Sequence, residues 1–218
     1  MVVSRGRKLG IAMMCCNCRR IVPIILLLAY VALFVLLAIS PYDRKVWLVE
    51  NIPTVVIVLV LVFAGRYYIF SPLSYILMFA FIVVHTVGGH YTFERVPFDM
   101  VTNLFGFARN NYDRLAHFSV GLYAYPIAEL LLAKKMVNSK VVLFLFPVFT
   151  ILSVACLYEI FEWLYAVSAD AKAGIAVLGS QGDIWDAQKD MLSDGLGAVA
   201  VTILFWILNK KKITQEVV

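Results

Sequence analysis

Six long apolar segments constrain the fold of this 218-residue chain more than any other feature of the sequence. The clearest is residues 21–40, IVPIILLLAYVALFVLLAIS, which carries no charge and is long enough to cross the hydrocarbon core of a bilayer. The mean hydropathy of +0.87 agrees, because a water-soluble domain of this size could not hide so much apolar surface. The predicted spans are residues 21–40, 47–65, 71–88, 114–133, 141–165 and 187–208.

These spans are expected to be helices, because lipid offers no hydrogen-bond partner to an unpaired backbone amide. The predicted fold class is therefore all-α: a polytopic membrane helix bundle with about six transmembrane helices. The bundle is expected to form one transmembrane domain over residues 21–208. A basic N-terminal tail, residues 1–20, and a basic C-terminal tail, residues 209–218, flank it.

The distribution of Lys and Arg predicts the orientation of the bundle. If the N-terminus is cytoplasmic, twelve of the 19 basic residues fall on the cytoplasmic side: eleven in the two tails and the short loop at 134–140, and Arg66 between the second and third spans. The positive-inside rule then predicts both termini in the cytoplasm and a multi-pass protein of the cell (inner) membrane. The net charge of +5 is explained by this topology and by membrane lipids as partners. Nucleic acid is excluded as a partner, because no basic patch alternates with aromatic residues outside the spans, and the oligomeric state is left open.

Three cysteines, Cys15, Cys16 and Cys18, precede the first span on the predicted cytoplasmic side. The sequence favours reduced thiols without a role over a metal or lipid-attachment site at these positions. Cys156 lies inside the fifth span and is expected to pack against neighbouring helices.

Acidic and imidazole side chains gather at the predicted outer ends of four spans. Asp113 and His117 are four residues apart at the start of the fourth span, and hence lie on one helix face. Glu159 and Glu162 are three apart near the end of the fifth span, where no helix cap requires a carboxylate. The remaining groups are His85 and His90 around the end of the third span, and Asp183, Asp186 and Asp190 at the start of the sixth.

This grouping needs electrostatic compensation. A carboxylate in a span costs about 2.5–3.5 kcal/mol on insertion scales, and the cost falls toward the interface. Compensation could come from Arg109, Arg114 and Lys189, or from a divalent metal ion that binds carboxylate oxygens and imidazole nitrogens. The pair Glu159 and Glu162 favours a cation between the two carboxylates, unless one of them is protonated.

Several of these residues also have simpler interpretations. Asp183 could cap the sixth helix, and His85 could be a packing residue. Glu129, near the predicted inner end of the fourth span, is expected to pair with Lys134 or Lys135. Small residues permit close helix approach, and this is the expected role of Gly88, Gly89, Gly121, Gly195 and Gly197.

Four motifs carry a family resemblance: GGHYTFERVPFD, RNNYDRLAHF, LYEIFEW and GSQGDIWDAQKDM. Together, over about residues 50–208, they resemble the YjdF-like family of multi-span prokaryotic membrane proteins. This resemblance implies fold and membrane location but no particular activity. A fainter similarity to VanZ-like envelope proteins is carried by Asp113, His117, Glu162, Asp190, Gly195 and Gly197, whereas the GGHYTFE segment has no counterpart there.

The leading hypothesis is a metal-dependent hydrolase or transferase that acts on a lipid or envelope precursor at the outer leaflet. Arg109 and Arg114 are expected to bind a substrate phosphate. The predicted catalytic residues are Glu159, Glu162, Asp186 and His90, and the predicted ligands of the divalent metal ion are His117, Glu162, Asp186, Asp190, Asp113 and His85. Two alternatives from other classes stay open: a cation or proton transporter, and a non-enzymatic membrane scaffold with a salt-bridged cap.

Overall fold

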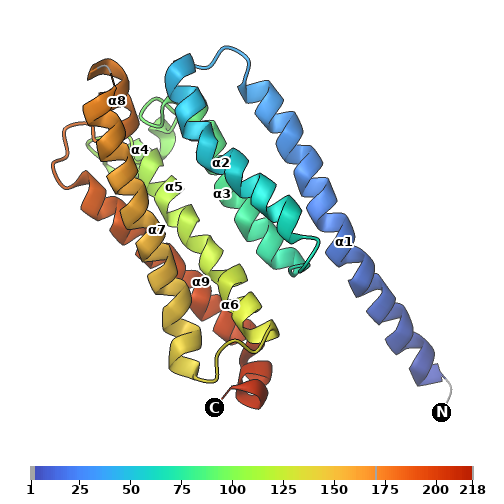
Figure 1. The fold of residues 1–218 in the computed structure, drawn as a ribbon. Helices are drawn as coiled ribbons and strands as arrows, with labels where there is room; N and C mark the ends of the chain where they lie inside the picture. Colours follow the sequence, from blue (N-terminus) through green and yellow to red (C-terminus); the bar gives the residue numbers. More distant parts are fainter. Residues whose placement is uncertain (1–2, 170, 218) are drawn as a thin grey trace.

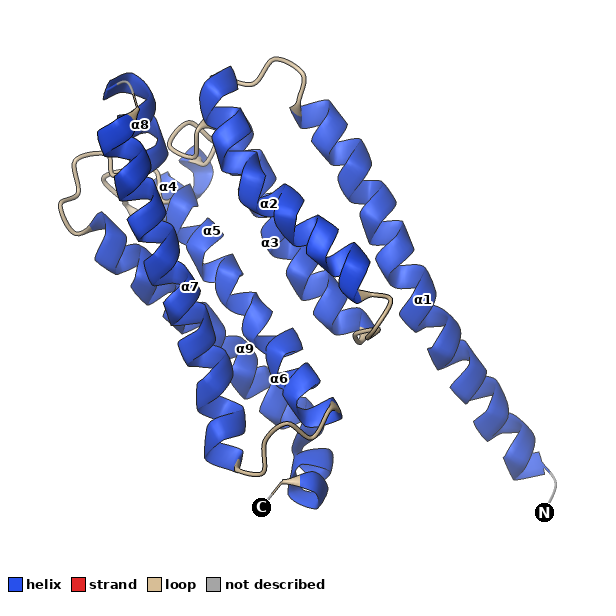
Figure 2. Ribbon diagram, in the orientation of Figure 1, coloured by secondary structure: helices blue, strands red, loops and turns tan. Residues whose placement is uncertain are grey.

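The computed structural model describes residues 3–169 and 171–217, with side chains described from residue 19 onward except at position 172. Within these residues every regular element is a helix (Figure 2). The side chains of Cys15, Cys16 and Cys18 lie outside the described part. The elements are α1 (Val3–Leu37), α2 (Arg44–Ala64), α3 (Pro72–Tyr91), α4 (Asp99–Phe105), α5 (Tyr112–Val120), the 3-10 turn η1 (Gly121–Tyr123), α6 (Ala124–Ala133), α7 (Lys140–Ser168), α8 (Ala171–Leu178) and α9 (Asp186–Glu216).

Six stretches of helix are long and apolar enough to cross a membrane, which confirms the predicted fold class. The fourth predicted span is continuous through α5, η1 and α6. The beginning of α1 and the end of α9 lie at the same end of the bundle (Figure 1), as an even number of spans requires. Which side of the membrane this end faces stays a prediction. The spans are Arg19–Leu37, Arg44–Ala64, Pro72–Tyr91, Tyr112–Ala133, Lys140–Ser168 and Asp186–Glu216.

Local sequence signals explain where several spans begin. Asp43 caps α2 by accepting hydrogen bonds from the backbone N–H groups of Lys45 and Val46, at 2.9 and 3.2 Å. Ser71 caps α3, and Pro72 follows it at the first helical position, where a missing N–H has no consequence. Ser139 caps α7 in the same way. These caps satisfy backbone N–H donors that have no partner within the first turn of each helix.

The spans form two groups (Figure 1). In the first, α1 and α2 pack on α3. In the second, α9 packs against α5, α6 and α7. The groups are joined mainly by α3, which packs on α5 and η1. Helix α1 is the least buried span, so most of its surface is left to lipid.

A glycine contact brings the fourth span and α9 together. A side chain at Gly121 would collide with the backbone of Gly197 and Ala198. In return, a side chain at Gly197 would collide with the backbone of Phe118. The two backbones therefore touch at this level, which confirms the close approach expected of these glycines. The contact fixes the depth at which acidic residues of α9 meet α5.

The connection between α7 and α9 folds over the predicted outer end of the bundle. It contains α8, which packs on α7 and also contacts α2. Ala173 and Val177 of α8 are buried against the spans. Gly179 follows with a positive φ of 59°, and its backbone lies beside the carboxylate of Asp113. Helix α8 thus covers the region where the acidic and imidazole groups gather.

Candidate metal site

His117 of α5 lies at the centre of the acidic cluster. Its Nδ1 is 2.9 Å from Oδ2 of Asp194 in α9, and both side chains are almost fully buried. With Asp194 ionised, this contact is a hydrogen bond that the imidazole donates, so the proton resides on Nδ1. The lone pair of Nε2 is then free and points away from Asp194. A carboxylate that orients an imidazole in this way is typical of metal-binding histidines.

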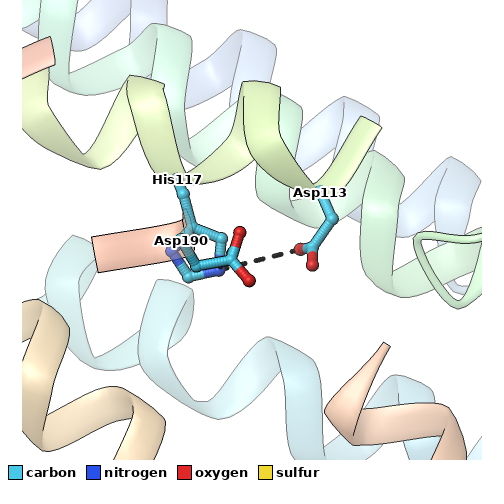
Figure 3. A group of neighbouring side chains, drawn as sticks. All are labelled: Asp113, His117 and Asp190. Atoms are coloured by element: carbon cyan, nitrogen blue, oxygen red, sulfur yellow. Dashed lines mark ion pairs between the residues drawn. The ribbon is translucent and has the colours of Figure 1, made fainter. Parts of the chain in front are cut away.

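Three carboxylate oxygens surround the free Nε2. Asp113 Oδ1, Asp190 Oδ1 and Glu159 Oε1 lie 3.8, 3.8 and 3.9 Å from it. They come from α5, α9 and α7, so three helices contribute one acid each. Figure 3 shows Asp113, His117 and Asp190 with their polar ends turned toward one another.

These distances are too long for hydrogen bonds and suit ligands around a common ion. Donor atoms of a tetrahedral zinc site, each at about 2.1 Å from the metal, are separated by about 3.4 Å. The ligand atoms of Asp113, His117 and Asp190 all lie within 4.8 Å of one another. Oε1 of Glu159 is buried and has no hydrogen-bond partner among the described residues. A buried carboxylate oxygen without a hydrogen-bond partner is costly, and a cation held by the other three groups would lower that cost. The donor set therefore fits a divalent ion.

Two arginines form ion pairs with the acidic residues at the start of α9. Arg114 forms ion pairs with Asp186, at 2.5 Å, and with Asp190. Arg109 pairs with the same Asp186 oxygen at 2.9 Å and also donates to the backbone oxygen of Ser180. Asp186 is therefore oriented toward the arginines, and the structure does not bring it to His117. The roles predicted for Asp186 as a ligand and for the arginines as phosphate-binding groups stay predictions.

Asp183 lies outside the spans and serves local structure. It accepts hydrogen bonds from Lys189 Nζ, at 2.6 Å, and from the backbone N–H of Trp185, at 3.1 Å. The Lys189 ammonium, followed by the Trp185 N–H, lowers the pKa of the Asp183 carboxyl below its ordinary value. Helix α9 begins only at Asp186, so Asp183 precedes the helix start by three residues.

A second polar cluster joins α2, α3 and α7 beside the first. Tyr158 donates a hydrogen bond of 3.1 Å to Oε2 of Glu50, and His85 Nε2 lies 2.8 Å from the backbone oxygen of Glu50. Glu50 is 2% exposed. Sequence reasoning missed this residue, although a lone acid inside the second apolar segment was the signal that could have found it. His85 thus belongs to this cluster and is separate from the His117 ligands.

Two other predicted residues lie elsewhere. His90 Nδ1 is 2.7 Å from the backbone oxygen of Leu37, which ties α3 to the end of α1 and places His90 apart from the cluster. Glu162 is buried on α7 and lines a cavity beside the cluster. Asp194, which orients His117, is a site residue that the sequence analysis missed. Its signal was the four-residue spacing from Asp190, which places both on one stripe.

A cavity of about 290 Å³ adjoins the site. Its predicted outer end is polar, with Asp113, His117 and Glu162 among the lining residues. The remainder is apolar and continues between the two groups of spans, past Ile57 of α2 and Ile151 of α7. The volume is at the lower limit for pockets that hold small organic molecules.

The fold and this site define a class: a polytopic helical membrane protein with a buried carboxylate and histidine cluster at one end of the bundle. The chain belongs to the family described as "Predicted membrane protein (DUF2238)", which matches residues 22–211. It is 37% identical over 168 residues to "Inner membrane protein YjdF" of Escherichia coli (strain K12), which covers 76% of this chain and 79% of that protein. No solved structure matches the chain. The expected family and the membrane location are thereby confirmed.

Proposed function

We propose that this protein is a metal-dependent hydrolase or transferase, and that its substrate is a lipid or lipid-linked envelope precursor at the predicted outer leaflet. The observation that carries the proposal is the environment of His117. Asp194 fixes the proton on one ring nitrogen, and three carboxylate oxygens lie 3.8–3.9 Å from the other. This arrangement suits a divalent cation, which would bind the free ring nitrogen and offset the charge of the carboxylates.

Each residue of the site would have a separate role in the reaction. Asp113, His117, Asp190 and Glu159 would hold the ion, and Asp194 would orient the imidazole. Such an ion supplies Lewis-acid polarisation of the bond to be cleaved. Glu162 lines the same cavity as His117 and Asp113, and would accept a proton from the attacking group. Arg114 would position Asp190 through their ion pair.

Two observations favour this function over transport or a scaffold. The cavity continues inward between apolar residues such as Val120, Ile127 and Ile151, whereas a path for a cation or proton would need polar groups along its length. A salt-bridged scaffold would satisfy its acids, but Glu159 Oε1 lies 3.9 Å from His117 and has no hydrogen-bond partner among the described residues.

Metal analysis of the purified protein tests the proposal. Wild-type protein is expected to carry one divalent ion per chain, and His117→Gln and Asp113→Asn are expected to reduce that content strongly. Asp99→Asn is a matched control, since it removes a carboxylate of α4 near the same end of the bundle but outside the cluster. Equal and negligible metal in all four proteins would overturn the proposal.

Turnover is measured separately in vesicles that contain a radiolabelled phospholipid or polyprenyl phosphate ester. Wild-type and Asp99→Asn proteins should release labelled product, and His117→Gln should not. Metal binding without any turnover of either lipid class would remove the enzymatic part of the proposal and leave the site.

A further inference from the structure

We propose that the apolar part of the cavity is a slot for one hydrocarbon chain of a membrane lipid, which reaches it sideways from the bilayer between α2 and α7. The inference rests on the proposed function for the reaction, because it identifies the substrate class of the same site. The binding of the chain itself stands on separate observations.

The first observation is the division of the cavity along α7. Residues from Thr150 to Glu162 line it, which corresponds to a length of about 18 Å at 1.5 Å per residue. The lower residues on this face, including Ile151 and Ala155, are apolar, and the upper ones are Tyr158 and Glu162. One leaflet of a bilayer has a hydrocarbon layer of about 15 Å. About 8 Å of this length, from Thr150 to Ala155, lies below the polar end, so the slot holds only a part of one hydrocarbon chain.

The second observation is the way the cavity is bounded. Helix α8 covers its predicted outer end with Ala176 and Val177, and Arg109 fixes the following loop at Ser180. Access from water is therefore covered. The side of the cavity that faces the membrane, between α2 and α7, is different. Each of these helices packs mainly on other helices: α2 on α3, and α7 on α6, α8 and α9.

The third observation concerns the edge of the slot. Val154 lines the cavity and is also 49% exposed on the membrane-facing surface of α7. At the site end, the hydrogen bond from Tyr158 to Glu50 joins α7 to α2. Below it, the facing residues are apolar, as Pro53 and Ile57 on α2 show. A hydrocarbon chain can pass such an opening without exposing polar backbone to lipid.

The cavity volume of about 290 Å³ accommodates part of one chain and leaves the rest of the lipid outside. A polar head group attached to that chain would meet His117 and Asp113. The bond that reacts is accordingly expected next to the glycerol or phosphate group of the lipid, and water-soluble substrates without a chain are expected to react poorly.

Photocrosslinking tests the slot without relying on turnover. The protein is reconstituted in vesicles of phosphatidylethanolamine that contain a phosphatidylglycerol with a diazirine at the end of one acyl chain. After irradiation, mass spectrometry locates the adducts. Adducts at Ile151 and Ala155, both 2% exposed, are expected, because lipid around the protein cannot reach them except through the cavity.

Filling the slot should remove these adducts. Ala155→Phe places a ring in the cavity and should reduce labelling at Ile151 by about tenfold. Val154→Phe at the edge should act in the same direction if the first variant does not fold. Leu157→Phe is the matched control, since Leu157 is on the same helix and 66% exposed to lipid, and it should leave Ile151 labelling unchanged.

The outcomes separate this inference from the proposed function. Labelling restricted to lipid-facing residues such as Leu157 in the wild type overturns the slot, even if metal is bound. Labelling of Ile151 that persists in His117→Gln supports the slot, even if metal and turnover are lost.

Discussion

Two carboxylate sites, a half-buried one at Glu129 and a buried one at His117, lie toward opposite ends of the same bundle, and they differ in how completely their oxygens are satisfied. Glu129 in α6 accepts four hydrogen bonds: from Tyr68 and the backbone of Ser71 at one oxygen, and from the hydroxyls of Ser71 and Ser74 at the other. In the His117 cluster, by contrast, four carboxylates surround one imidazole, and Oε1 of Glu159 has no hydrogen-bond partner among the described residues.

The difference separates a structural carboxylate from a binding site. Glu129 ties the start of α3 to α6, and all its acceptor capacity is used for that purpose. The pairing with Lys134 or Lys135 that the sequence predicts for Glu129 is replaced by these hydroxyl and backbone donors. The His117 cluster gathers four carboxylates around one imidazole, and under the proposed function a divalent cation would offset the charge that Arg114 does not pair.

The largest expected effect is at the structural site. Glu129→Ala leaves four donors of Tyr68, Ser71 and Ser74 without their acceptor, and should lower the free energy of unfolding by about 3–5 kcal/mol. Unfolding in mixed detergent micelles measures this. Metal content per folded chain should not change, and a loss of metal in this variant would remove the distinction between the two sites.

The second-largest expected effect is the loss of stability when the metal is removed. A ligand that binds the folded state at 100 times its Kd stabilises it by about 2.7 kcal/mol, so a chelator should reduce the stability of wild-type protein by about this amount. His117→Gln, which lacks the central ligand, should show no response to the chelator. Equal responses of the two proteins would place the metal elsewhere.

A smaller effect is expected from the residue that orients His117. Asp194→Asn keeps the side-chain volume but removes the negative charge beside Nδ1, and should weaken metal affinity about 10–100-fold. Competition with a fluorescent chelator measures the affinity. Asp99→Asn is the control, because Asp99 lies on α4 outside the cluster and should leave the affinity unaltered.

The six spans could be predicted from the sequence, because their length and apolar composition alone define them. It also placed Asp113, His117 and Asp190 at one level, since spacing within a helix and the alternating direction of spans determine depth. It could not choose between Asp186 and Asp190 as the acid near His117, because that depends on the rotation of α9 set by the contact of Gly121 with Gly197 and by the ion pairs of Arg114.

The acids of other helices were harder to assign for the same reason. Glu159 and Glu162 share a face of α7, yet Glu159 lies at His117 and Glu162 lines the cavity. Glu50 reaches the neighbouring cluster only because α2 packs on α3 beside His85. Such contacts between helices follow from tertiary packing, which the spacing of residues along one helix does not encode.

The smallest expected effect is at Glu159, and its sign is opposite to that at Glu129. It tests the difference between the two sites most directly. Without metal, Glu159 adds an unsatisfied charge to a buried cluster that is already negative. Glu159→Gln removes this charge with little change of shape, so metal-free protein should keep or gain stability, by about 0–1 kcal/mol. The same substitution should weaken metal binding.

The stability is measured in mixed micelles with chelator present, beside Glu129→Gln as the isosteric counterpart. A destabilisation of Glu159→Gln as large as that of Glu129→Gln would show that the cluster is a satisfied structural network, and the argument for a metal would then fail.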